Sequence, residues 1–75
     1  MEQTDFSWAL KHLKNGARMC RMGWHGKGMW VELQRPTDES KMNLPYLYIR
    51  TEELDLVPWV ASQTDILADD WQRVS

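Results

Sequence analysis

The chain has 75 residues and a net charge of −2 at neutral pH, which is enough for one domain (residues 1–75) with a thin core. Its single cysteine, Cys20, excludes an intramolecular disulfide. Because the spacing of Cys20, His12 and His25 matches no zinc motif, we predict no metal site and no cofactor.

The sequence gives no indication of membrane spanning or secretion. No apolar run is long enough to cross a bilayer, and the first residues lack the basic and apolar regions of a signal peptide. We therefore expect a soluble, intracellular protein with no membrane partner. A core this thin usually needs further support, and five tryptophans and five methionines suit an interface between subunits, so we predict a homo-oligomer.

Charge is distributed unevenly along the chain. Residues 1–27 carry five Lys or Arg against two acids, whereas residues 51–75 carry six acids against one Arg. A long nucleic acid would be repelled by the acidic half, so we predict a small anionic ligand and no nucleic-acid partner. The alternative is that the two halves attract each other, within a protomer or across an oligomer.

Apolar residues at i, i+3, i+4 and i+7 predict an N-terminal helix. Thr4 or Asp5 can cap its start and Gly16 can end it. Trp8 lies about 160° around the helix from Leu10 and so points away from the apolar stripe, and we expect it to be exposed to a partner protomer or a ligand. The stripe consists of Phe6, Ala9, Leu10 and Leu13.

Strand patterns follow the first helix. Residues 17–22, 29–34 and 44–50 are predicted strands. Because Pro58 lacks an amide donor, the apolar residues 56–60 should form either an edge strand or an extended segment that leaves the sheet at Pro58. A short helix should start at Ser62 or Thr64 and end near Asp70, and residues 71–74 can return as a last strand. The predicted fold is α+β: an N-terminal helix packed on a small, mainly antiparallel sheet, with a short C-terminal helix.

The turn between the first two strands is the most distinctive segment of the chain. The ten residues from Arg21 to Trp30 contain three of the four glycines, two tryptophans and two basic groups. A flat stacking face, close backbone approach and positive charge together suit a flat anion such as a nucleotide. The spacing fits neither a Walker loop nor a dinucleotide fingerprint. The alternative is a packed hairpin, in which Trp30 is core or assembly surface and His25 is an ordinary surface residue.

Catalysis has little support in the sequence. Cys20 has neighbouring arginines but no assured base, and Ser62 is better explained as a helix cap than as a nucleophile. We therefore predict that the protein is not an enzyme. Gln63 and Asp65 could read a purine edge and a ribose hydroxyl, or could serve only as capping residues.

Four motifs span nearly the whole chain in order: Asp5-Phe6-x-x-Ala9-Leu10-x-x-Leu13-Lys14-x-Gly16, Arg21-x-Gly23-Trp24-x-Gly26-Lys27-Gly28-Met29-Trp30, Leu44-Pro45-Tyr46, and Val57-Pro58-Trp59-x-Ala61-Ser62-Gln63-x-Asp65-x-Leu67-Ala68-x-Asp70-Trp71. Together they resemble the phage-borne Thoeris anti-defence family of the second type. Two departures from that family are His25, in place of the common asparagine, and the segment Glu53-Leu54-Asp55, which lacks a glycine often found there.

The resemblance implies a non-enzymatic sponge in the cytoplasm of the infected bacterial host. Such proteins sequester cyclic ADP-ribose isomers made by Toll/interleukin receptor-domain enzymes, and some hold cyclic dinucleotides of the CBASS pathway at separate sites. It also implies a homotetramer with pockets between protomers. The remaining alternative is a phage interaction or virion protein whose tryptophans serve assembly only. The ligand-binding residues implied for this chain are Phe6, Arg21, Trp24, His25, Gly26, Lys27, Gly28, Met29, Ser62, Gln63 and Asp65.

Overall fold

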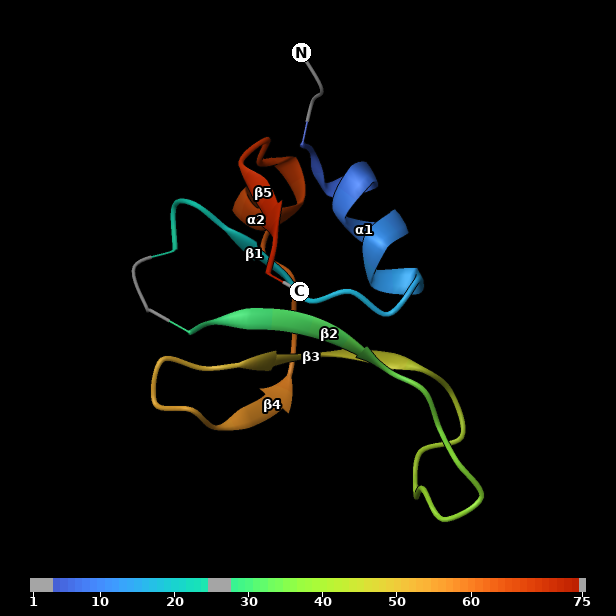
Figure 1. Ribbon diagram of the computed structural model, residues 1–75. Helices are drawn as coiled ribbons and strands as arrows, with labels where there is room; N and C mark the ends of the chain where they lie inside the picture. Colours follow the sequence, from blue (N-terminus) through green and yellow to red (C-terminus); the bar gives the residue numbers. More distant parts are fainter. Residues whose placement is uncertain (1–3, 25–27, 75) are drawn as a thin grey trace.

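The computed structural model describes residues 4–24 and 28–74 and has the predicted α+β architecture (Figure 1). A nine-residue helix is followed by strands, a second short helix and a last strand. The elements are α1 (Phe6–Lys14), β1 (Met19–Arg21), β2 (Trp30–Gln34), β3 (Tyr46–Arg50), β4 (Leu56–Pro58), α2 (Gln63–Leu67) and β5 (Trp71–Arg73).

The strands form one antiparallel sheet in the order β4-β3-β2-β1-β5. The predicted edge strand is confirmed, because β4 ends at Pro58 and pairs only with β3 among the described strands. The predicted last strand is confirmed as β5, which pairs with β1 so that Arg21 lies opposite Trp71. This pairing brings the start of β5 beside the glycine-rich turn.

Helix α1 begins and ends as the sequence predicts. The Asp5 carboxylate accepts a hydrogen bond from the Trp8 amide at 2.9 Å, which is an N-cap. Gly16 follows the C-cap with a φ of 92°, a conformation that favours glycine. The expected exposure of Trp8 is wrong: its indole is half-buried, stacks edge-on against His12 at 4.6 Å and packs against the core. An indole is wide enough to reach the core from the flank of the helix.

The core lies between α1 and one face of the sheet. It is thin, as expected, and the opposite face carries no helix in the described part of the chain (Figure 1). On that opposite face Trp30 is nevertheless buried, because the Arg18 guanidinium lies 4.3 Å from its ring centre and Tyr48 packs against it edge-on. The core cluster consists of Ala9, Leu13, Ala17, Met19, Val31 and Trp71.

The second helix is shorter than predicted. Ser62 caps α2 by accepting from the Asp65 amide at 3.1 Å, but the helix ends at Leu67 and not near Asp70. Ala68 is already extended, with a ψ of 152°, and this lets the chain turn so that Asp70 faces β1. No helix among the described residues is long and apolar enough to cross a membrane.

Candidate functional site

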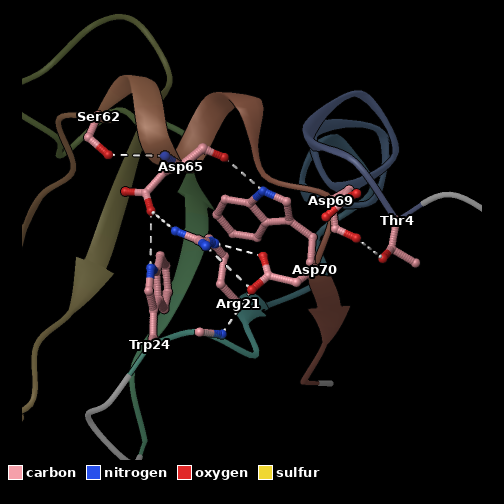
Figure 2. A network of polar contacts seen from close by, with 9 residues as sticks. Thr4, Arg21, Trp24, Ser62, Asp65, Asp69 and Asp70 are labelled. Carbon is pink, nitrogen blue, oxygen red and sulfur yellow. Dashed lines mark hydrogen bonds and ion pairs between the residues drawn. The ribbon is translucent and has the colours of Figure 1, made fainter.

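Arg21, at the end of β1, joins three segments of the chain. Its Nε donates to Asp70 Oδ1 at 2.7 Å and its Nη1 donates to Asp65 Oδ1 at 2.8 Å (Figure 2). The side chains of Arg21 and Asp65 are each only 16% exposed. Hydrogen bonds to Asp70 and then to Asp65 raise the pKa of Arg21 further above its ordinary value. The guanidinium therefore holds the N-terminus of α2 and the start of β5 against the turn.

Asp65 connects this ion pair to the tryptophan of the turn. The Trp24 Nε1 donates to Asp65 Oδ1 at 3.1 Å, the same oxygen that Arg21 contacts (Figure 2). Burial of the Asp65 carboxyl opposes ionisation, but the hydrogen bonds with Arg21, Trp24 and Ser62 and the positive charge of Arg21 together outweigh it, so the pKa of Asp65 lies below its ordinary value. The carboxylate is ionised and fixes the orientation of the Trp24 indole.

Asp70 is the second carboxylate of the network. It accepts from Arg21 and also from the Gly23 amide, whose nitrogen lies 2.9 Å from Asp70 Oδ2. The Arg21 hydrogen bond is the main reason that the pKa of Asp70 lies below its ordinary value. A Cβ atom on Gly23 would lie 3.0 Å from the same carboxylate oxygen, so a larger residue here would require the Asp70 side chain to shift by a few tenths of an ångström.

An aromatic cluster lies beside these charges. Trp71 is 1% exposed and donates through its Nε1 to the Asp65 carbonyl oxygen at 3.0 Å. Around it, Trp24 packs edge-on at 5.4 Å, Trp59 edge-on at 5.9 Å and Phe6 at a tilt at 5.5 Å. Trp24 is thus held by a hydrogen bond at its nitrogen and by a ring contact, while part of its surface stays exposed.

The structure brings five of the expected site residues together. Ser62 lies beside them as the cap of α2 and not as a nucleophile. Asp65, for which capping or ribose recognition was expected, accepts hydrogen bonds from the side chains of Arg21 and Trp24. The five residues are Phe6, Arg21, Trp24, Ser62 and Asp65.

The other expected residues are less closely connected. Gln63 and Gly28 are exposed and Met29 is half-buried ahead of β2. His25, Gly26 and Lys27 lie outside the described residues.

Sequence reasoning assigned no role to Asp70, Trp59 or Trp71. Asp70 and Trp71 close the last of the four motifs, and a carboxylate next to a tryptophan was the available signal. A short stretch of sequence cannot show that a carboxylate and an arginine 49 positions apart will pair, because sheet pairing between β1 and β5 creates that contact.

Three hollows of the described structure, of about 140, 360 and 240 Å³, are lined by other residues. None of these three includes Trp24 or Asp65. These three cavities therefore do not form the Trp24 site, which in the described residues is a partly exposed face of the indole.

Comparison with known proteins gives one family. Residues 4–74 match the Thoeris anti-defense 2-like domain. A protein named Thoeris anti-defense 2 from Bacillus phage SP01 is 35% identical over 84 aligned positions, which cover 95% of this chain and 94% of that protein. The expected resemblance is confirmed: this chain belongs to the Thoeris anti-defense 2-like family.

Proposed function

We propose that this protein is a phage anti-defence sponge that binds cyclic nucleotide immune signals and holds them without cleavage. The signals are cyclic ADP-ribose isomers and, as a second class, cyclic dinucleotides. Capture in the cytoplasm of the infected bacterial host would keep free ligand below the level that activates Thoeris and CBASS effectors. Family membership supports the anti-defence role.

The observation that carries the binding proposal is the fixed indole of Trp24. Its nitrogen is bonded to Asp65 and its ring edge packs on Trp71, so a partly exposed aromatic face is held in place next to a glycine-rich turn. A rigid aromatic face binds a base with little loss of side-chain entropy. Lys27 and His25 of the turn are the proposed contacts to phosphate and base edge, with Gly26, Gly28 and Met29 completing one wall of the site.

Arg21 and Asp65 contribute to this proposed site as supports. Because each already pairs with the other, their charges hold the turn and α2 together behind Trp24. Gln63, which is exposed beside Ser62, remains the proposed reader of the purine edge.

A homotetramer with pockets shared between protomers would supply the second wall. Ten large hydrophobic side chains of the described residues are exposed in the single chain, which supports association. A pocket between rigid protomers would also limit the cost of ordering on binding.

The test is calorimetric titration with a panel of cyclic ADP-ribose isomers and cyclic dinucleotides. Wild type should bind at least one of them, and Trp24→Ala should weaken binding by roughly tenfold to a hundredfold, because stacking on one aromatic residue contributes about 1–3 kcal/mol. Trp24→Phe, which keeps a ring but loses the bond to Asp65, should fall between the two. A sizing column should show the same oligomer for all three proteins.

The alternatives predict different outcomes. Absence of heat with every ligand would favour a phage assembly protein whose tryptophans serve contacts only. Recovery of cleaved ligand after heat denaturation of the complex would indicate a hydrolase. Unchanged affinity in Trp24→Ala would remove Trp24 from the site.

A further inference from the structure

An apolar groove with basic groups lies at one end of the molecule, away from Trp24. It has a volume of about 360 Å³ and runs between α1 and the β2–β3 pair. Four leucines line it together with two basic side chains, and no acidic side chain lines it among the described residues. The leucines are Leu10, Leu13, Leu33 and Leu47, and the basic residues are Lys14 and Arg35.

The two basic groups have no carboxylate partner in the described part of the chain. The three ion pairs found there use Arg18 and Arg21 as their cations. Arg35 is oriented by its Nη2, which donates to the Lys14 carbonyl oxygen at 2.7 Å, at the C-terminal end of α1. The groove therefore has an apolar interior beside the positive charges of Lys14 and Arg35, and no carboxylate among the described residues pairs with them.

The turn between β3 and β4 has the complementary character. It carries Glu52, Glu53 and Asp55 around Leu54, and these carboxylates form none of the described ion pairs. Leu54 is 58% exposed. The turn is closed by its own backbone, since the Thr51 amide donates to the Asp55 carbonyl oxygen at 2.8 Å. It is a fixed acidic projection with an apolar side chain at its centre.

Leu54 also has an unusual backbone conformation. Its φ is 68°, in the left-handed region that a leucine rarely adopts, and it is the one non-glycine residue with positive φ among the described residues. Such strain is kept where a surrounding constraint or a function requires it. Within one chain Leu54 is largely exposed, so the folded protomer gives no packing reason for a leucine at this position.

We propose that the acidic turn of one copy, residues 51–55, docks into the leucine groove of a second copy. Leu54 would enter the groove, and the carboxylates beside it would meet Lys14 and Arg35. One chain cannot fill its own groove, because the groove and the turn lie at opposite ends of β3 (Figure 1). In a two-fold pair each turn faces the other copy's groove, so both contacts form at once and the assembly closes.

Neither surface includes a residue proposed to bind the nucleotide, so this contact can be tested without ligand. It shares with the proposed function only the requirement that the protein self-associates. Loss of nucleotide binding in Trp24→Ala leaves this contact standing, and an assembly that survives charge reversal overturns this contact but not nucleotide capture.

The first experiment is a charge exchange followed by light scattering on a sizing column. Glu52→Lys/Glu53→Lys makes both surfaces basic, and Lys14→Glu/Arg35→Glu makes both acidic. Each variant alone should have a smaller mass than wild type. An equimolar mixture should regain the wild-type mass, because each reversed surface then meets an opposite charge. Circular dichroism should show that each variant is folded.

Controls keep this experiment specific to the contact. Asp38→Lys/Glu39→Lys reverses the same charge on an exposed part of the β2–β3 connection and should keep the wild-type mass. The proposal is overturned if wild type is monomeric at about 100 μM, if either reversed variant keeps the wild-type mass, or if the mixture does not regain it.

The second experiment separates assembly from protomer stability. Leu54→Asn removes the apolar side chain but suits a left-handed residue, since asparagine tolerates positive φ. Association should weaken by roughly tenfold to a hundredfold, as for loss of one buried leucine, while the unfolding temperature of the dissociated chain should not fall. Unchanged association would overturn the proposal.

Discussion

At the scale of single residues, the structure gives Arg21 and Asp65 a different role from the one that their charges suggest. Each could bind a ligand, but in the structure they bind each other, with Asp70 as a second partner of Arg21. Removing one member of a partly buried pair leaves the other charge without compensation, which costs more than the intact pair contributes. The same Asp65 oxygen accepts the hydrogen bond from Trp24. The orientation of the Trp24 indole therefore depends on the Arg21–Asp65 ion pair.

Asp70 gives the residue-scale prediction. Asp70→Asn should lower the free energy of unfolding at pH 7 by about 1–2 kcal/mol, because charge-assisted bonds to Arg21 and the Gly23 amide weaken. The pKa of Asp70 is lowered in the folded state, so its stabilisation is present above the ordinary aspartate pKa, about 3.9, and is lost as the pH falls through the folded value. The difference from wild type, measured by urea denaturation, should therefore shrink below about pH 4.

A neighbouring carboxylate supplies the matched control. Asp69 is exposed and uses its backbone carbonyl, not its side chain, to accept from Thr4. Asp69→Asn should change stability little at any pH. A deficit in Asp70→Asn that stayed constant down to pH 2 would contradict an ionic origin.

At the scale of elements, local patterns were sufficient for α1. Its apolar spacing, its cap at Asp5 and its stop at Gly16 all lie within a dozen residues, so each could be predicted from the sequence. Helix α2 was less predictable. Its start at Ser62 follows from local chemistry, but its early end allows Asp70 to reach Arg21 across the sheet.

The turn of residues 51–55 shows another limit at this scale. The sequence showed that the segment lacks a glycine, and the structure shows a left-handed φ at Leu54. Leucine carries no local signal for that conformation. It follows from the closure of the turn by Thr51 and Asp55 between two paired strands.

The cap of α1 gives the element-scale prediction. Asp5→Ala should lower the free energy of unfolding by about 1 kcal/mol, because the Trp8 amide loses its acceptor. Asp5→Asn keeps an acceptor oxygen, so it should lower the free energy of unfolding by only about a few tenths of a kcal/mol. Thermal or urea unfolding followed by circular dichroism would measure both, and equal losses in the two variants would show that charge, not capping, stabilises the start of α1.

At the scale of the whole molecule, part of the charge asymmetry is resolved within the protomer. Arg21 of the basic half pairs with Asp65 and Asp70 of the acidic half. This is the attraction between the two halves that the sequence left open as an alternative. The turn of residues 51–55 and the groove at Lys14 retain opposite charges that have no described partner. These remaining charges are the ones available for association.

Salt dependence is the corresponding prediction. If docking uses those charges, the dissociation constant of the assembly should rise between about 0.05 and 0.5 M NaCl, because exposed charge pairs are screened over shorter distances at higher salt. Analytical ultracentrifugation would measure the shift. Glu52→Lys/Glu53→Lys places like charges at the contact, so its residual association should not weaken as salt rises. Tighter association at high salt would indicate a purely apolar interface.

The sequence by itself determined the α+β fold class, the order of the helices and strands, and the family. These properties depend on periodicity, caps and motifs, which are set by residues close together in the chain. The tertiary structure decided which charges pair, which tryptophan face is held, and which surfaces lie at opposite ends of β3. Arg21 meets Asp65 and Asp70 from 44 and 49 positions away, and only the pairing of β5 with β1 brings them within hydrogen-bond distance.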